Sequence, residues 1–220
     1  MRQSGAARPA GRPPGALSPP VLYLIVCGAG PAHDVPAFLR LARSAGWAVC
    51  VAATPQGMDL LDLDQVAALT DHPVRADYTP VSPPWPHADA ILVAPATLNT
   101  VNKLAAGIAD SFALALLTEC LGLDLPIFVA PNVNPALARH PRFRASLDEL
   151  AAWGVHVLYE RTAPPPVWMT PWAEIIERLS ASGLPGLGVG SSADARNPTH
   201  VRGTPRKSRG GSSRAVPPPP

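Results

Sequence analysis

Short apolar runs alternate with amphipathic stretches along the middle of the chain. The runs have the length of buried strands, about four to eight residues, and contain many β-branched and small apolar residues. We predict strands at Val21–Cys27, Ala48–Ala53, Ala90–Ala94, Leu125–Ala130 and Gly154–Leu158. Apolar residues at three- and four-residue spacing predict helices at 34–45, 59–71, 101–119, 143–152 and 170–181. Strands that alternate with helices indicate an α/β fold with a parallel sheet.

The central stretch 91–110, ILVAPATLNTVNKLAAGIAD, has the pattern of a strand, a tight polar loop and a helix. Pro95 has no backbone N–H and is expected to end the strand, and the helical pattern begins at Val101. The loop between them places hydroxyl and amide side chains, with the N–H groups of a helix start, at the carboxyl end of a strand. Ligands bind there in open α/β sheets. The alternative is an ordinary turn in which Asn99 or Thr100 caps the helix.

The two ends of the chain differ from its middle in composition. Residues 1–20 and 183–220 are rich in Pro, Gly, Ser and Arg without a periodic apolar pattern, so we predict disordered tails around one domain at 21–182. The formal charge of +2 combines an acidic domain with these basic tails. The basic run 202–214 has the charge to contact nucleic acid, but a solvated tail is the simpler interpretation and we expect no nucleic-acid partner.

Neither a membrane span nor a metal site is predicted. The longest apolar stretch, 21–27, is far shorter than the roughly 20 residues of a spanning helix. The N-terminus is too broken by Pro and Gly to form a signal-peptide apolar region. Cys27, Cys50 and Cys120 lie in apolar surroundings without CxxC spacing. They indicate buried thiols in a cytoplasmic protein rather than disulfides or zinc ligands.

The central stretch resembles a motif of the flavin-dependent cysteine decarboxylases, a family that includes phosphopantothenoylcysteine decarboxylase and the lantibiotic peptidyl-cysteine decarboxylases. PATLNT at 95–100 is similar to the PASANT-type motif, and KLAAGIAD at 103–110 continues the match. VCGAGPA at 26–32 is similar to the opening βα turn of that family. The resemblance covers about residues 21–160. It implies a three-layer, Rossmann-like (flavodoxin-like) parallel sheet flanked by helices, with FMN as cofactor.

The resemblance also implies which residues form the site. The turn after the first strand would meet the FMN phosphate, and a threonine at the end of the second strand would contact FMN. The implied FMN-binding residues are Gly28, Ala29, Thr54, Pro95, Ala96, Thr97, Asn99, Thr100 and Asp110. Asn134 matches a family asparagine that helps to hold the substrate carboxylate, and is the implied catalytic residue. An Asx turn before Pro135 is the alternative for Asn134.

Two catalytic features of the family are missing. The family carries a histidine about eight residues before the Ala-Asp pair that opens the central strand, and Val81 occupies that position here. Valine cannot transfer a proton, so either His87 takes the role from a shifted position or that help is lost and His87 is a turn residue. No cysteine follows Cys120, whereas the family has one in a late flap. We expect packing or turn roles for His140 and His156.

Several functions remain open on the sequence alone. The first is an FMN-binding redox or decarboxylase-like enzyme that acts on a small carboxylate or cysteine-derived substrate. A prenyl-FMN-type flavin transferase, which shares the fold and lacks the histidine, is the second. The third is a non-catalytic flavin-binding or regulatory subunit whose basic tails dock an acidic partner. The all-round apolar stretch 112–117 and the resemblance to trimeric proteins together predict a homotrimer or an assembly of trimers.

Overall fold

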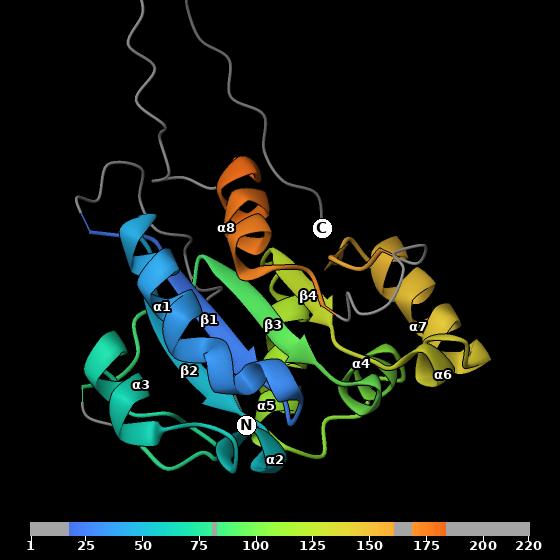
Figure 1. Cartoon of the computed structure of the whole chain (residues 1–220), viewed down its shortest axis with the longest axis horizontal. Helices are drawn as coiled ribbons and strands as arrows, with labels where there is room; N and C mark the ends of the chain where they lie inside the picture. Colours follow the sequence, from blue (N-terminus) through green and yellow to red (C-terminus); the bar gives the residue numbers. More distant parts are fainter. Residues whose placement is uncertain (1–17, 81–82, 161–168, 184–220) are drawn as a thin grey trace, which may run out of the picture. The chain divides into compact units, whose positions relative to one another are not determined.

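Five parallel strands form the centre of the protein (Figure 1), seen in a computed structural model that describes residues 18–80, 83–160 and 169–183. The strands are β1 (Val21–Val26), β2 (Ala48–Ala53), β3 (Ala90–Ala96), β4 (Ile127–Pro131) and β5 (His156–Val157). They pair in the order β2-β1-β3-β4-β5. This arrangement confirms the predicted α/β, Rossmann-like sheet. The described residues lie in the first of two units, 1–188. Of the tails predicted at 1–20 and 183–220, residues 1–17 and 184–220 lie outside the described residues.

Helices cover both faces of the sheet. One face packs against α1 (Val35–Ser44), α3 (Leu63–Thr70) and α8 (Trp172–Ala181). The other packs against α4 (Leu98–Ala105), α5 (Phe112–Gly122) and α7 (Pro141–Ala152). Three short helices lie in the loops: η1 (Gly30–Asp34), α2 (Pro55–Met58) and α6 (Pro135–Ala138). Figure 1 shows α1 in front of the strands and α5 behind them, so the sheet is the middle of three layers.

Helix α1 shows why the sequence produces this layer. Its buried residues Val35, Phe38, Leu39 and Ala42 follow three- and four-residue spacing and form one apolar stripe against the sheet. Gly46 follows the helix with a φ of +87°, a left-handed conformation that costs glycine little. The chain can therefore turn back at once into β2.

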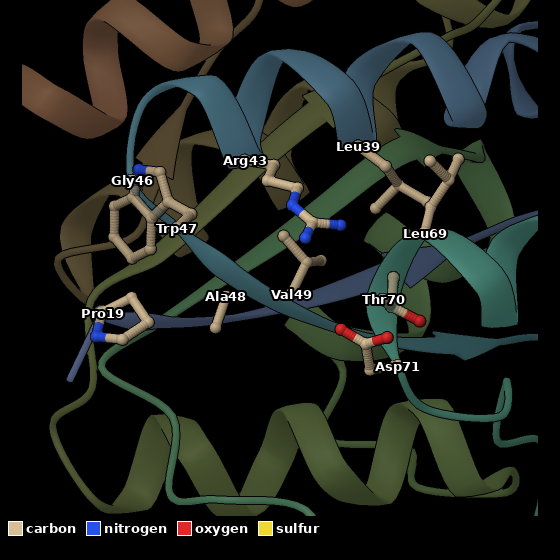
Figure 2. A pocket seen from close by; sticks show the side chains of 10 residues that line it. All are labelled: Pro19, Leu39, Arg43, Gly46, Trp47, Ala48, Val49, Leu69, Thr70 and Asp71. Atoms are coloured by element: carbon tan, nitrogen blue, oxygen red, sulfur yellow. The ribbon is translucent and has the colours of Figure 1, made fainter.

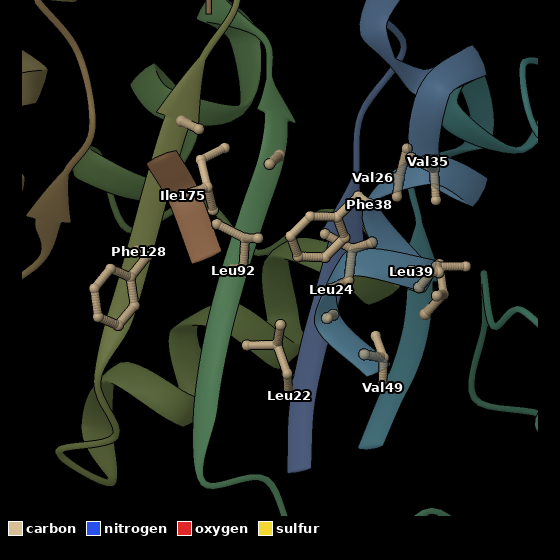
Figure 3. Close-up of a cluster of buried hydrophobic side chains, with 14 of the residues drawn as sticks. Leu22, Leu24, Val26, Val35, Phe38, Leu39, Val49, Leu92, Phe128 and Ile175 are labelled. Atoms are coloured by element: carbon tan, nitrogen blue, oxygen red, sulfur yellow. The ribbon is translucent and has the colours of Figure 1, made fainter. Parts of the chain in front are cut away.

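The core beneath α1 contains large side chains that are completely buried. Figure 3 shows Phe38 of α1 close to Leu24 of β1, with Leu92 of β3 and Phe128 of β4 along the same face. Phe38, Leu24 and Leu92 have no exposed surface. Burial of one such side chain contributes roughly 1.5–3 kcal/mol relative to exposure. This core fixes the strands whose ends form the candidate site.

The prediction that Pro95 ends the central strand is wrong, because β3 continues to Ala96. The register with β4 shifts between Val93 and Ala96, and this irregularity accommodates a residue without an N–H. The carbonyl of Pro95 accepts a hydrogen bond from Cys27 N at 3.2 Å. The peptide bond before Pro95 is cis. The strand therefore stays tied to both neighbours through the proline.

The single helix predicted at 101–119 is also wrong, because the segment forms two helices. Helix α4 begins three residues earlier than predicted and ends at Ala105, and α5 starts at Phe112. Gly107 between them has a φ of +68°. The hydroxyl of Ser111 then caps α5 by accepting a hydrogen bond from a backbone N–H at 3.3 Å. The break places residues 106–111 in a loop.

Smaller differences affect other element boundaries. The helix predicted at 59–71 begins only at Leu63, because the carboxylate of Asp62 caps it by accepting from Gln65 N at 3.0 Å. The last strand, β5, contains two residues. None of the helices in the described part of the chain is long and apolar enough to cross a membrane.

Candidate functional site

The loops that follow β1, β2, β3 and β4 meet at the carboxyl edge of the sheet, because the strands are parallel. Backbone hydrogen bonds tie the first residue of three of these loops to a neighbouring strand. Cys27 N donates to Pro95 O at 3.2 Å, Thr54 N donates to the last carbonyl of β1 at 2.9 Å, and Asn132 N donates to Ala96 O at 2.8 Å. After β1 the chain continues to β2 on one side of the sheet, whereas after β3 it continues to β4 on the other side. Open α/β sheets bind ligands at such a reversal.

The loop after β3 is held by a small hydroxyl network. Oγ1 of Thr97 accepts from Thr100 N at 3.3 Å and lies 3.1 Å from Oγ1 of Thr100. Cys27 Sγ donates to Thr100 Oγ1 at 3.3 Å, and burial raises the pKa of this thiol, so it stays protonated. Thr97 is therefore the cap of α4, which corrects the expectation that Asn99 or Thr100 would fill that position. Thr100 is buried inside the network.

The first turn of α4 has the donor chemistry that a phosphate requires. Its leading backbone N–H groups have no partner within the helix, and the turn contains no carboxylate. Asn99 is exposed, and among the described residues its side-chain amide has no hydrogen-bond partner. Neutral hydroxyl and amide donors at a helix N-terminus fit the phosphate of a flavin mononucleotide.

The loops after β1 and β2 are packed tightly against each other. A Cβ at Gly28 would lie 2.5 Å from Cβ of Gln56, and a Cβ at Gly57 would lie 2.3 Å from a β1 carbonyl oxygen. Thr54 caps α2 by accepting from Gly57 N at 3.1 Å, and its side chain is 9% exposed. Ala29 follows Gly28 in extended conformation. Gly57 was not predicted as a site residue, although a glycine three residues after a capping threonine can indicate a close approach of two backbone segments.

The remaining predicted cofactor residues differ in what they offer. Pro95 and Ala96 are buried in β3, and their carbonyl oxygens accept hydrogen bonds from Cys27 N and Asn132 N. Asp110 is exposed and forms an ion pair with Lys103 Nζ at 2.6 Å. Lys103 lies in α4 and Asp110 in the loop before α5, so this ion pair bridges the break between the two helices. In the sequence, the pair is indicated by two opposite charges seven residues apart.

Asn134 lies on the next loop of the same edge, after β4. Its Oδ1 accepts from Leu137 N at 2.9 Å and so caps α6, which is the predicted Asx alternative. The cap uses the carbonyl of the amide and leaves the two N–H donors of Nδ2. Asn134 is exposed. The cap therefore does not prevent Nδ2 from binding a carboxylate.

The predicted histidine and flap positions fall in different places. Val81 and the flap segment 161–168 lie outside the described residues. His87 is exposed. His140 caps α7 by accepting from a backbone N–H at Nδ1, and His156 stacks on the ring of Phe128 with centroids 4.4 Å apart. The expected turn and packing roles of His140 and His156 are therefore confirmed.

All three cysteines are buried free thiols. Burial raises the pKa of Cys50 to about 12, and burial with the charge of Glu119 raises that of Cys120 to about 11. Such thiols are weak nucleophiles at neutral pH, because the thiolate is the reactive form. None of the three fits a catalytic thiol.

A cavity of about 280 Å³ lies at the other end of the sheet (Figure 2). Trp47, Val49 and Leu39 form much of its apolar lining, and Arg43 and Asp71 also line it. It adjoins the amino end of β2, whereas Thr54 follows the carboxyl end. The cavity is therefore separate from the candidate site.

Comparison with known proteins points to flavin-dependent proteins. A family model described as Flavoprotein matches residues 14–182. A cysteine/cysteine sulfinic acid decarboxylase of an unknown prokaryotic organism is 35% identical over 101 residues, which cover 42% of this chain and 27% of that protein. The phosphopantothenoylcysteine decarboxylase of Arabidopsis thaliana is 30% identical over 116 residues, 48% of this chain and 55% of that protein. The matched regions thus span 27% and 55% of these curated relatives.

A solved structure supports the same likeness. The chain is similar to the FMN-dependent cysteine decarboxylase TvaF from thioviridamide biosynthesis, with a TM-score of 0.54 and 29% identity. That match covers 66% of this chain and 90% of TvaF.

Proposed function

Because the chain belongs to the Flavoprotein family, whose model matches residues 14–182, we propose that it binds FMN at the carboxyl edge of its sheet. We further propose that it catalyses a decarboxylase-like reaction on a small carboxylate or cysteine-derived substrate. The proposal draws support from relatives that are cysteine and phosphopantothenoylcysteine decarboxylases. Residues 21–182 would form the flavoprotein domain.

One observation carries the cofactor assignment. The segment 95–100 runs from the end of β3 into the first turn of α4 and is fixed by the contacts of Cys27 with Pro95 and Thr100. It places the first turn of this eight-residue helix, without a carboxylate, at the reversal point of the sheet. A phosphate or ribityl chain is a suitable ligand for such a turn.

The roles proposed for the residues follow from their positions. The N–H groups of the α4 first turn, the amide of Asn99 and the hydroxyl of Thr97 would bind the phosphate. Gly28 and Ala29 would bring backbone close to the ligand, and Thr54 would donate its hydroxyl hydrogen while its oxygen accepts from Gly57 N. The buried Thr100 would orient the loop instead of contacting FMN.

Asn134 would position the substrate. Its Oδ1 is held by the cap of α6, so the orientation of Nδ2 is fixed before a ligand arrives. Nδ2 would donate to the substrate carboxylate. When bound, FMN would supply the two-electron redox chemistry.

The first test is the visible absorption spectrum of the purified full chain, with the released cofactor identified by mass. The flavin-loaded protein is then assayed for CO₂ release from peptides that end in cysteine and from phosphopantothenoylcysteine. Yellow protein that yields FMN, with CO₂ release from one substrate, is the expected result. A colourless chain that cannot be reconstituted with FMN would refute the cofactor assignment.

The Asn134→Asp variant tests the substrate role separately from folding. Asp is as good a helix cap as Asn, so the free energy of unfolding should change by less than about 0.5 kcal/mol. The variant replaces the Nδ2 donors with a second carboxylate oxygen, which repels a substrate carboxylate. We expect FMN affinity to persist and CO₂ release to fall. Unchanged turnover would show that Asn134 is only a cap.

A second candidate is a flavin-binding protein without turnover, which the valine at position 81 favours. FMN bound firmly, with no CO₂ release from either class of substrate, would favour this candidate. Absence of a general acid or base at this position would cost roughly 10²–10⁴ in rate. A Val81→His variant that gains decarboxylation would identify the missing group.

We also propose a homo-oligomer, a trimer or an assembly of trimers, in the cytoplasm. Ala115, Leu116 and Leu121 on α5 remain half-buried, and Leu123 after it is 44% exposed. Such an apolar outer face is suited to a second copy of the chain. Light scattering after size exclusion is the test, and a monomer at micromolar concentration would refute the oligomer.

A further inference from the structure

Arg75 lies beside the carboxyl end of the edge strand β2. Its N–H donates to Val51 O at 2.9 Å, and its carbonyl accepts from Ala53 N at 2.8 Å. This isolated parallel bridge pairs Arg75 with Ala52, which lies two residues before Thr54 in the sequence. The arginine is therefore close to one end of the proposed FMN site.

The guanidinium group of Arg75 lies between two aromatic rings. Its Cζ is 4.7 Å from the ring centroid of Phe112 and 5.2 Å from that of Trp85. Phe112 is the first residue of α5, immediately after the loop that contains Asp110. Cation–π contacts use the flat faces of the guanidinium group and of the rings. The N–H groups point outward in the plane of the guanidinium group and are left free as donors.

The described residues satisfy few of those donors. Nη2 makes one long hydrogen bond, 3.4 Å, to the carbonyl of Asp77, and Nε is buried without a hydrogen-bond partner. The carboxylate of Asp77 accepts from Thr79 N at 2.8 Å, and its pKa is lowered by the hydrogen bonds from Thr79 and, to a smaller extent, by the charge of Arg75. In the described ranges no carboxylate forms an ion pair with Arg75, and that of Asp110 is already paired with Lys103.

The neighbourhood adds positive potential. Helix α5 has eleven residues and no acidic side chain in its first turn, so its N-terminus favours negative charge beside the guanidinium. The half-buried Arg75 thus combines a fixed planar fork, unused donors and a helix N-terminus. A planar fork of this kind binds two oxygens of one anion.

We propose that Arg75 forms an anion subsite next to the flavin site, which takes a carboxylate or phosphate group of the ligand through Nη1 and Nη2. That the anion belongs to the substrate rests on the proposed function. The anion-binding property of Arg75 does not, because it follows from the donors and rings alone. Arg75 is then a specificity-determining residue that selects substrates with a second, non-reacting acidic group.

Arginine modification by phenylglyoxal, with each site located by mass spectrometry, tests the subsite in the full wild-type chain. Acetate and inorganic phosphate are the two probes, and chloride at equal ionic strength is the control. Arg178, which pairs with Glu174 on α8, is the internal reference. We expect saturable protection of Arg75 by one of the probes, with no change at Arg178, and the effective probe identifies a carboxylate or a phosphate as the ligand group.

Other results would overturn the proposal. Equal protection at both arginines would show general screening. An Arg75 that never reacts would show that the guanidinium is closed to ligands. The test needs no flavin, so an FMN titration of the same preparation separates failure of the subsite from failure of the proposed function.

A variant pair extends the test to the flavin-loaded enzyme. Arg75→Gln removes the charge and fork, and should raise KM for an acidic substrate about 10- to 100-fold, the value of a hydrogen bond to a charged group. FMN affinity and KM for a substrate without the second acidic group should stay unchanged. Arg178→Gln is the matched control. An equal change in KM for both substrates would assign Arg75 a structural role only.

Discussion

Replacement of Thr97 by valine separates the two roles that this residue has in the proposed site. The substitution keeps the shape of the side chain and suits the extended backbone of the cap, with φ −84° and ψ 158°. It removes the acceptor for Thr100 N at 3.3 Å and the hydroxyl contact at 3.1 Å. Loss of a threonine cap costs about 1 kcal/mol. The Thr100 hydroxyl keeps its contact with Cys27, so the loss should stay close to that value.

FMN changes the expected magnitude. At 100 times Kd, a ligand stabilises the folded state by about 2.7 kcal/mol, and a tenfold weaker Kd at the same concentration reduces this to about 1.4 kcal/mol. If Thr97 also binds the phosphate with an energy worth tenfold in Kd, the variant loses about 1 kcal/mol without FMN and about 2.3 kcal/mol with it.

Urea unfolding with and without FMN measures both numbers. Asp62→Ala is the control, because Asp62 caps α3 through Gln65 N at 3.0 Å on the other face of the sheet. It should lose the same free energy in both conditions. Equal losses for Thr97→Val with and without FMN would refute the phosphate role and leave Thr97 as a cap.

Three further predictions follow from packing and burial. Gly57→Ala should destabilise by about 1–3 kcal/mol in urea unfolding because its Cβ would meet a β1 carbonyl at 2.3 Å, whereas Gly30→Ala, with open space around it, should change stability by less than about 0.5 kcal/mol. Phe38→Ala, fully buried in the α1 face, should lower the unfolding free energy by about 3–5 kcal/mol, and a loss similar to a surface substitution would contradict the core described here. Burial raises the pKa of Cys50 to about 12 and of Cys120 to about 11, above the ordinary 9.0, so the unfolded chain releases these protons at lower pH than the folded chain. The free energy of unfolding should stay constant below pH 9 and fall as the pH rises above it. A flat profile in urea titrations would show that the thiols are not buried.

The sheet could be predicted because its strands are buried on both faces and leave continuous apolar runs in the sequence. The break between α4 and α5 could not. Alanine and isoleucine at 105–109 continue the helical period, and a periodic pattern averages over many residues. The break depends on the backbone of one residue, Gly107, and on the cap at Ser111.

The site could be predicted as a place but not as a set of contacts. Thr54, Thr97 and Asn134 were named from the family resemblance, and parallel strands explain why all three follow strands that end at one edge of the sheet. The orientation of Thr100 depends on Cys27, a partner that no local pattern identifies. The Flavoprotein match supports the cofactor, and the contacts of each residue come from the fold.

The hydrogen bond between Cys27 and Thr100 joins residues that are 73 positions apart. Closing a loop of that length costs entropy before the contact returns any energy, so we expect the contacts between β1 and β3 to form later in folding than local contacts within the helices. During synthesis, β1 and β2 can pair long before β3 leaves the ribosome, but the hydrogen bonds between β1 and β3 cannot form until then. The residues up to Thr100 must therefore be synthesised before the proposed cofactor site can form, and one edge of β1 stays unpaired until β3 arrives.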